Sequence, residues 1–345
     1  MPMPDPTKPV ELGRPLVPPC QLTRLRFRPD GRVLAAAGCD GKVRRWDTSA
    51  DAPTELPALD GHNGWVSGLV FSTSALVTTD SWGRLTARDA DGRQLWTVET
   101  AHAGWARAVA VTADGNLLAT GGRDGFVRFW DARTGTKTGE ANATADVLSV
   151  GFAPDGKAVL AGDLFGVVRE FEAPGGRAGR TFEARELHRL DRVQDVGGVR
   201  CLLVTPDGRT LVVGGAEPKT GGFVECTPLM IAFDRPSGKR LWQWKGGAPA
   251  EGYVTDLAWH PGGYVVACTS GQPGQGKVFF LKPGDAQPFF QVPKPNVHSV
   301  AVTADGTKLA AALTNANSAG NGRVRGQGGD YPQNHSPVQL WRLPS

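Results

Sequence analysis

One pattern recurs along nearly the whole sequence, and this repetition restricts the possible folds more than any other feature. It is clearest in residues 111–131, VTADGNLLATGGRDGFVRFWD, where an apolar run, an Asp-Gly turn, a strand of small residues, a second Asp-Gly turn and a strand ending in Trp-Asp follow one another. Residues 27–47 and 152–172 repeat the pattern at the same length. Self-similarity with a period of about 40 residues is typical of propellers and solenoids.

The chemistry within each repeat favours short antiparallel strands. Runs of about 5 β-branched and aromatic residues are bounded by Gly, Pro and Asp, as strands in small sheets are. A Pro-Asp-Gly or Ala-Asp-Gly step, which supplies a turn with a side-chain acceptor and a residue that accepts positive φ, stands at 29–31, 113–115, 154–156, 206–208 and 304–306. A single four-stranded sheet cannot bury both of its faces, so the sheets must stack around an axis. We therefore predict an all-β fold, a seven-bladed β-propeller of four-stranded antiparallel blades.

These motifs make the sequence similar to the Trp-Asp (WD) repeat family over nearly all of its length. That family has a hydrogen-bonded set of His, Ser or Thr, Asp and Trp, and the resemblance assigns this structural tetrad to His102, Thr120, Asp124 and Trp130. The second repeat has His62 and Thr78 or Thr79, but Trp82 and Arg88 stand at its Asp and Trp positions. We therefore expect the third repeat alone to have the complete set.

The two ends of the sequence predict how the ring closes. Residues 1–9 are rich in Pro, and we expect them to be disordered, with residues 10–345 forming a single WD-repeat propeller. The last repeat ends at VQLWRLPS and leaves room for only three strands. Residues 10–17 are therefore predicted to supply the outer strand of blade seven.

Composition argues against several other classes of protein. Of 345 residues 40% are hydrophobic, which is enough for a core, and no apolar run approaches the roughly 18 residues of a membrane span. The N-terminus has no apolar segment of a secretory signal, so we expect a cytoplasmic protein. The five cysteines contain no CxxC pair, which argues against a disulfide framework and a zinc site. We expect no metal, no cofactor and no small-molecule substrate.

The net charge of +4 is mildly basic and lower than a dedicated nucleic-acid binder would have. In the first repeat Arg24, Arg26, Arg28, Arg44 and Arg45 alternate with apolar residues, which we interpret as solvated strand faces. A nucleic-acid-binding subunit stays open as an alternative because two further arginines lie in the long segment of the seventh repeat, Arg323 and Arg325.

Longer connections between the second and third strands distinguish repeats five, six and seven. In the family that this sequence resembles, these connections emerge on the face from which each first strand is entered, so we expect one loop-rich face. Loops on a rigid scaffold often carry function. Trp, Tyr and Arg, which are enriched in interface hot spots, stand near strand entries on that face. The candidate partner-binding residues are Trp65, Trp105, Arg107, Arg123, Arg200, Tyr253 and His298, together with Arg323 and Arg325. Trp65 and Trp105 could instead be wedges between blades.

No catalytic motif is evident, since the sequence lacks GxSxG, HExxH and GxxxxGK[ST]. The segments 233–244, FDRPSGKRLWQW, and 88–96, RDADGRQLW, resemble the Asp-x-x-x-Gly-Lys-x-x-Trp segments of pyrroloquinoline-quinone dehydrogenase propellers, so a quinoprotein-like enzyme is a remote alternative. The enzymes of that class resemble one another in having eight blades, whereas we count seven repeats in this sequence. The sequence therefore predicts a non-catalytic scaffold that binds other proteins or peptides.

Overall fold

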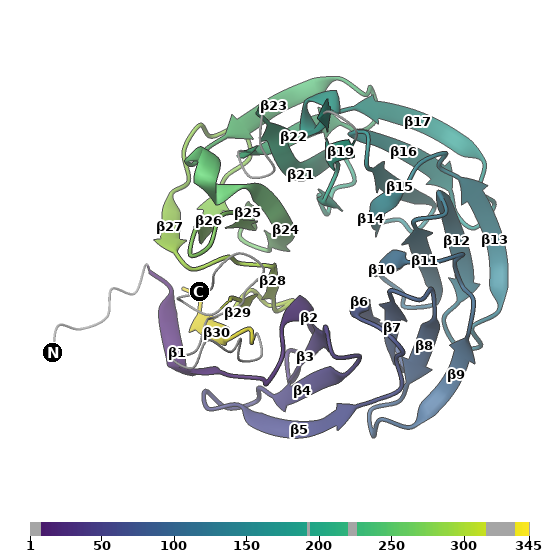
Figure 1. The fold of residues 1–345 in the computed structure, drawn as a ribbon, viewed down its shortest axis with the longest axis vertical. Helices are drawn as coiled ribbons and strands as arrows, with labels where there is room; N and C mark the ends of the chain where they lie inside the picture. The colour runs from purple at the N-terminus through teal and green to yellow at the C-terminus, as the bar shows by residue number, and fades with distance from the viewer. Residues whose placement is uncertain (1–7, 192–193, 220–225, 315–334, 345) are drawn as a thin grey trace, which may run out of the picture.

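The computed structural model of the protein describes residues 8–191, 194–219, 226–314 and 335–344. In these residues seven four-stranded antiparallel sheets surround a common axis, and one two-stranded sheet is added between blades four and five (Figure 1). The prediction of an all-β, seven-bladed propeller is therefore confirmed. The domain division at residue 10 stays a prediction, and its disordered segment falls mostly on residues 1–7, which lie outside the described residues.

Blades one to four are each built from four consecutive strands, ordered from the axis outward. Blade one contains β2 (Leu22–Phe27), β3 (Val33–Gly38), β4 (Val43–Asp47) and β5 (Thr54–Leu59). Blade two contains β6 (Val66–Phe71), β7 (Leu76–Asp80), β8 (Leu85–Arg88) and β9 (Gln94–Val98). Blade three contains β10 (Ala106–Val111), β11 (Leu117–Gly122), β12 (Phe126–Asp131) and β13 (Lys137–Asn142). Blade four contains β14 (Val147–Phe152), β15 (Ala158–Asp163), β16 (Val167–Glu172) and β17 (Ala178–Glu183).

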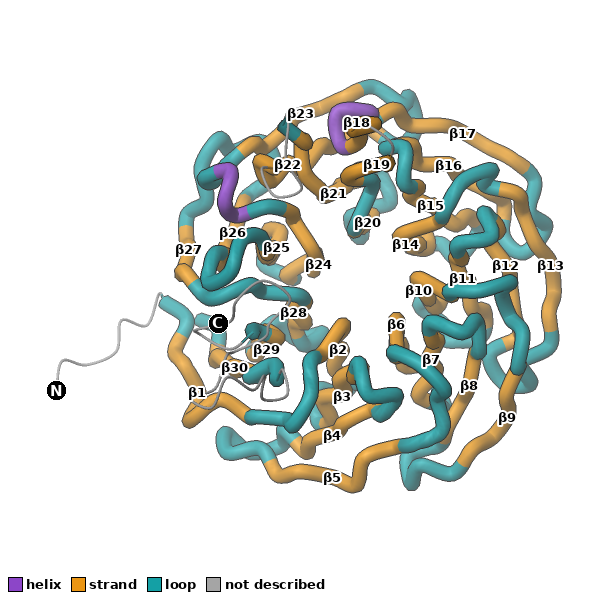
Figure 2. Tube along the Cα trace, viewed as in Figure 1, coloured by secondary structure: helices purple, strands orange, loops and turns teal. Residues whose placement is uncertain are grey.

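The remaining blades follow the same order until the last. Blade five contains β20 (Cys201–Val204), β21 (Thr210–Pro218), β22 (Cys226–Asp234) and β23 (Arg240–Lys245). Blade six contains β24 (Tyr253–His260), β25 (Tyr264–Ser270), β26 (Gly276–Leu281) and β27 (Phe290–Pro293). Blade seven contains β28 (Ser299–Val302), β29 (Lys308–Ala312), β30 (Val338–Arg342) and, outermost, β1 (Val10–Leu16). Outside the blades lie the hairpin β18 (His188–Asp191) and β19 (Gln194–Gly197) and the 3-10 helices η1 (Arg185–Leu187) and η2 (Pro249–Glu251) (Figure 2).

The N-terminal strand closes the ring, as predicted. β1 pairs with β30 in antiparallel register, with Val10 opposite Arg342 and Leu12 opposite Leu340. Figure 1 shows the purple N-terminal strand lying against the yellow C-terminal strand. Blade seven therefore joins the two ends of the polypeptide, and its sheet is complete only because both contribute to it.

The core is divided into seven hydrophobic clusters of described residues, one at each junction between neighbouring blades. Strand β3 shows how the sequence produces this arrangement. Ala35 and Ala37 belong to the cluster shared with blade two, whereas Leu34 and Ala36 belong to the cluster shared with blade seven. Because successive side chains of a strand point to opposite faces of its sheet, an uninterrupted apolar strand covers both neighbours at once.

Two of the enlarged connections have more regular structure than the sequence predicted. In blade five, β21 and β22 continue as a paired hairpin as far as Pro218 and Cys226. The connection after blade four forms η1 and the β18–β19 hairpin, in which His188 Nε2 lies 2.8 Å from Asp195 Oδ1. The predicted loop of blade seven falls mostly on residues 315–334, which lie outside the described residues.

Candidate functional site

Blade three contains the full set of four side chains that the resemblance assigned to the tetrad. His102 Nδ1 lies 2.9 Å from Asp124 Oδ1, and His102 Nε2 lies 2.8 Å from Thr120 Oγ1. Trp130 Nε1 donates a hydrogen bond to Thr120 Oγ1 at 2.9 Å. Burial lowers the pKa of His102, so the ring is neutral at pH 7. Its Nδ1 also lies 2.8 Å from Arg128 Nη1, so Asp124 and Arg128 both face the same ring nitrogen. These contacts tie the strand entry to β11 and β12.

Blade two has an equivalent network that the sequence analysis did not predict. His62 Nδ1 lies 2.9 Å from Asp80 Oδ2, and His62 Nε2 lies 2.7 Å from Thr78 Oγ1. The expectation that Trp82 replaces the aspartate was therefore wrong, because Asp80, two positions earlier, supplies the carboxylate. The sequence signal is the D-x-x-G turn, DSWG at 80–83, in place of the Asp-Gly turn of blade three.

Blade four has the same D-x-x-G turn, DLFG at 163–166, but no histidine of the described residues binds its carboxylate. Asp163 Oδ1 accepts hydrogen bonds from the backbone N–H groups of Phe165 and Val167, both at 2.9 Å. Arg169 Nη1 lies 2.5 Å from Asp163 Oδ2 and takes the place of the histidine. The turn carboxylate is therefore bound by a histidine in blades two and three and by an arginine in blade four.

The interpretation of the first-repeat arginines as solvated was wrong for at least two of them. Arg44 and Arg45 are only 5% and 7% exposed. Arg44 forms two hydrogen bonds with Asp40, at 3.0 and 2.6 Å, and Arg45 donates to the backbone oxygens of Pro57 and Ala90. Both side chains therefore lie within the blade junctions instead of on a solvated face.

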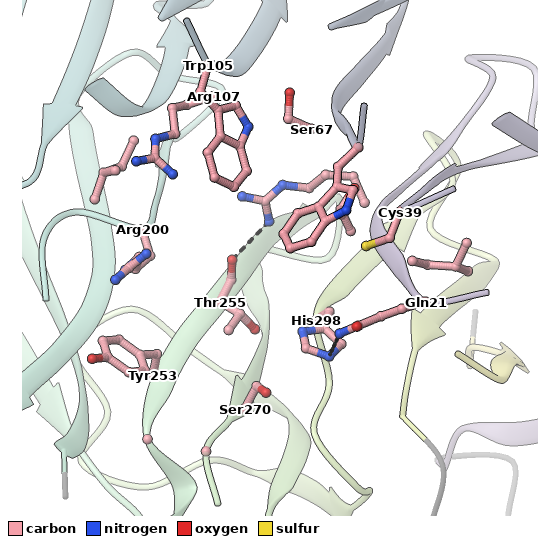
Figure 3. Close-up of a pocket in the computed structure, with 17 residues that line it drawn as sticks. Gln21, Cys39, Ser67, Trp105, Arg107, Arg200, Tyr253, Thr255, Ser270 and His298 are labelled. Carbon is pink, nitrogen blue, oxygen red and sulfur yellow. Dashed lines mark hydrogen bonds between the residues drawn. The ribbon is translucent and has the colours of Figure 1, made fainter. Parts of the chain in front are cut away.

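A cavity of about 640 Å³ opens where the first strands of the blades surround the axis, and we call it the axial pocket (Figure 3). Its walls come from first strands, strand entries and second-strand ends, and all seven blades contribute to them, because the first strand of every blade begins at the same end of the ring. The residues that line it are Gln21, Leu22, Thr23, Arg24, Cys39, Trp65, Ser67, Trp105, Arg107, Leu148, Arg200, Gly252, Tyr253, Thr255, Ser270, Gly271 and His298.

Six of the nine residues proposed for partner binding line this pocket, namely Trp65, Trp105, Arg107, Arg200, Tyr253 and His298. Arg123 does not line it: its side chain is exposed, and its backbone N–H donates to Trp105 O at 2.9 Å. Arg323 and Arg325 lie outside the described residues. Arg24 is a pocket residue that the sequence analysis missed, because its alternation with apolar residues suggested a solvated position.

The aromatic side of the pocket is formed by two tryptophans from neighbouring blades. The rings of Trp65 and Trp105 meet edge to face, with centroids 5.8 Å apart, and the Arg107 guanidinium lies 4.4 Å from the centroid of the Trp105 ring. Trp65 is 50% exposed, and Trp82, which packs against the backbone of Gly64, is 68% exposed. Trp65 is therefore not merely a buried wedge between blades. Trp105 is partly buried, and its Nε1 is buried.

The three arginines of the pocket differ in how their charges are balanced. Arg107 binds Asp146, which precedes β14 of the next blade, through two hydrogen bonds of 3.0 and 2.6 Å. Arg24 Nη1 donates to Thr255 O at 3.0 Å, a contact drawn in Figure 3, and lies 3.8 Å from Asp256 Oδ2. Arg200 lies over the ring of Tyr253 at 5.1 Å, and its Nε is buried without a hydrogen-bond partner among the described residues. Burial lowers the pKa of Arg200.

Below the pocket the axial channel narrows to a cavity of about 70 Å³ that Arg24, Arg107 and Arg200 also line. Here the buried Asp256 accepts hydrogen bonds from Arg26 Nη1 at 3.0 Å and Ser299 Oγ at 2.5 Å. Burial alone would raise the pKa of Asp256, but the guanidinium groups of Arg26 and Arg24 lower it below its ordinary value. The floor of the channel is thus an internal ion pair.

His298, on the blade-seven side of the pocket, is a neutral group. Its Nε2 lies 3.4 Å from Gln21 Nε2 (Figure 3). Burial, helped by the positive charge of Arg24, lowers the pKa of His298 to about 4. At pH 7 the ring therefore adds hydrogen-bonding capacity to the pocket but no charge.

In the part of the protein that the structure describes, no group of three or more His, Cys, Asp or Glu residues is arranged to hold a metal ion. No helix in that part has the length and apolar character that crossing a membrane requires. The two segments that resemble quinoprotein sequences form the turns from β22 into β23 and from β8 into β9.

Seven four-stranded blades define this protein as a seven-bladed β-propeller, and blade three has the His-Thr-Asp-Trp hydrogen bonding that the resemblance to WD repeats implies. A family model described as "WD domain, G-beta repeat" matches residues 18–47 and 92–131, which lie in blades one to three. The sequence is also similar to the small ribosomal subunit protein RACK1y of Oryza sativa subsp. japonica, with 36% identity over 102 residues. That similarity covers 28% of this protein and 30% of the relative, so the match spans less than a third of the relative's length.

Proposed function

We propose that this protein is a non-catalytic scaffold that binds other proteins or peptides at the axial pocket and on the tryptophans beside it. The observation that carries the proposal is the exposure of Trp65 and Trp82 next to a concave pocket lined by guanidinium and aromatic groups. Large aromatic residues and arginine dominate the binding energy of protein interfaces, since they bury much area and donate directional hydrogen bonds. Exposed aromatic residues beside a pocket are typical of a docking surface.

A closed ring suits this role because it holds the docking residues in place before a partner arrives. The first strands of adjacent blades contact one another around the whole axis, and Trp65, Trp105 and Arg200 each stand immediately before one of these packed strands. Less conformational entropy is then lost on binding than if the same residues stood on mobile loops. The ring contributes rigidity, and the side chains at the strand entries contribute specificity.

The similarity to WD repeats supports a scaffold over an enzyme, since repeat propellers offer extended binding surfaces without requiring a catalytic group. A loop-rich face that widens the contact area is part of the proposal, as is a cytoplasmic location. The alternative function, a nucleic-acid-binding subunit, predicts a different salt response: phosphate contacts make the logarithm of affinity fall steeply with the logarithm of salt concentration.

Selection from a library of random peptides displayed on phage tests the proposal directly. We expect the native protein to enrich a set of peptides that share a motif, and we expect Trp65→Ala to abolish their binding. Leu241→Ala is the matched control, because Leu241 is a similarly exposed apolar residue, 53%, on the outer strand β23. Failure to enrich any motif, or equal loss of binding in Leu241→Ala, would contradict the proposal.

A further inference from the structure

The pocket lining has an excess of positive charge that the described residues do not fully balance. Three guanidinium groups line it and no carboxylate does. His298 adds no charge at neutral pH, because burial lowers its pKa to about 4. Arg107 is neutralised by Asp146, and Arg24 shares the buried Asp256 with Arg26. Any ligand that enters the pocket at pH 7 therefore meets a positive field.

Arg200 is the one pocket guanidinium that has no carboxylate partner among the described residues. Its neighbours are the Tyr253 side chain and, as the nearest carboxylate influence, Asp146, which Arg107 already binds with both oxygens. Its buried Nε makes no hydrogen bond to a described residue. A desolvated charge without an ionic partner costs free energy, and an incoming anion regains part of that cost. The arrangement therefore selects for a negatively charged group placed against Arg200.

The chemistry of the anion that binds Arg200 follows from the charges around this arginine. Arg200 is a single guanidinium without a carboxylate of its own, and one carboxylate supplies the one negative charge that it lacks, whereas a phosphate group carries close to two charges at neutral pH. Arg also matches the geometry of a carboxylate, since its N–H groups can bind both oxygens at once. A position further down the axial channel is unfavourable for an anion, because the channel narrows there and its lining includes the carboxylate of Asp256.

The opposite wall of the pocket recognises a different kind of side chain. Trp65 is half exposed and stands edge to face against Trp105, and Trp82, which lies against the backbone of Gly64, is exposed as well. An apolar side chain next to the carboxylate would cover these rings and exclude water from the Arg200 contact. A nucleic acid is a poorer match, because tight binding of its backbone needs several Lys or Arg side chains that neutralise phosphates, whereas Arg107 and Arg24 of this pocket already have carboxylate partners.

We propose that the axial pocket binds an acidic peptide segment, with a carboxylate seated against Arg200 and a neighbouring apolar side chain against Trp65 and Trp105. This proposal rests on the scaffold function proposed above and names the chemistry of the partner. The carboxylate is that of an Asp or Glu residue or of the peptide's own C-terminus, two sources of the same group.

The test extends the peptide selection to a pair of arginine variants. Arg200→Met removes the charge and keeps an unbranched side chain, while Arg133→Met removes an exposed arginine from the turn between β12 and β13, at the other end of the ring. We expect the native protein and Arg133→Met to enrich peptides with Asp, Glu or a free C-terminus at one fixed position, and Arg200→Met to lose that preference while still enriching the apolar position. Arg200→Lys should retain part of the acidic preference.

Affinities of one enriched peptide give the quantitative result. Replacing its acidic residue by the matching amide should weaken binding to the native protein by roughly tenfold to a hundredfold, as loss of a hydrogen-bonded charge does, and should change binding to Arg200→Met by less than about twofold. Peptides with an amidated or a free C-terminus separate the two sources of carboxylate.

Enriched peptides without a shared acidic position would overturn this inference but would not contradict the scaffold function. Failure to enrich any motif would overturn the scaffold function itself. Preference for a phosphoserine peptide, or displacement of the peptide by single-stranded RNA, would also overturn this inference.

Arg200→Met should fold, because it removes a charge that has no ion-pair partner among the described residues. We expect its melting temperature to equal or exceed that of the native protein. A large decrease would show that Arg200 is bound by a group within the protein, and that result would contradict the inference independently of peptide binding.

Discussion

Leu12 lies opposite Leu340 in the antiparallel ladder that joins the first strand of the protein to the last. Leu12 is 7% exposed and packs in the cluster between blades seven and one. Removing residues 1–17 deletes this strand, leaves β30 as an unpaired edge and exposes that cluster. We expect the free energy of unfolding to fall by at least about 3 kcal/mol, the sum of several lost ladder hydrogen bonds and one buried leucine.

Chemical denaturation of the truncated and native proteins measures this effect, and two point variants locate its origin. Leu12→Ala should cost about 2 kcal/mol through lost burial. Glu11→Ala, which breaks only an exposed ion pair with Lys294, should cost less than about 1 kcal/mol. An unchanged stability of the truncated protein would refute closure by the N-terminal strand.

The two histidine networks predict unequal effects of the same substitution. Thr120 Oγ1 serves both His102 and Trp130, whereas Thr78 Oγ1 serves His62 in a blade that has Arg88 at the tryptophan position. Thr120→Val therefore removes the partner of two buried atoms, His102 Nε2 and Trp130 Nε1, whereas Thr78→Val removes the partner of one, His62 Nε2. At about 1–3 kcal/mol for each unsatisfied group, denaturant titration should show the larger loss for Thr120→Val. Equal losses would mean that the indole hydrogen bond contributes nothing.

The number of blades was predictable from the sequence, and so was the closure of the ring, because both depend on local turn chemistry and on repeat period. The hydrogen-bond network of blade two was not predictable, since such a network is defined by side-chain positions in space. Asp80 binds His62 from a position in the turn two residues earlier than the aspartate of blade three. The burial of Arg44 and Arg45 was also missed. Alternation of polar and apolar residues identifies a solvated face only when one face of a sheet meets water, whereas both faces of a propeller blade are covered.

The candidate site was predictable in part for a related reason. Strand entries converge on the axis in any closed ring, so Trp65, Trp105 and Arg200 could be grouped in advance. The balance of charge in the pocket could not be predicted from the sequence. Arg107 and Arg24 bind carboxylates that belong to other blades, Asp146 and Asp256. Only the three-dimensional arrangement distinguishes these arginines from Arg200.

His298 predicts that the protein loses stability in weak acid. Its pKa of about 4 in the folded protein lies below the value of about 6.5 expected for an unfolded polypeptide. Between these values the unfolded state binds more protons, so stability falls as the pH falls from about 6.5 towards 4, by up to roughly 3 kcal/mol. His298→Gln should flatten this part of the stability profile measured by denaturant titration at several pH values. An unchanged profile would show that His298 is protonated as readily in the folded protein as in the unfolded state.

Arg107 and Asp146 form a bond between blades three and four, and this predicts that their contributions to stability are coupled. Their side chains are 23% and 14% exposed, so water screens the pair only partly. Arg107→Ala leaves Asp146 covered and unpaired and should cost about 1–3 kcal/mol, whereas removing both groups avoids the unpaired charge. The double variant should therefore lose at least about 1 kcal/mol less than the sum of the two single variants, as interacting neighbours do.

The control is Arg123→Ala, which removes an exposed arginine beside the same strand entry and should change stability by less than about 0.5 kcal/mol. Additive single losses would show that Arg107 is held chiefly by the Trp105 ring, 4.4 Å from its guanidinium, and not by the carboxylate.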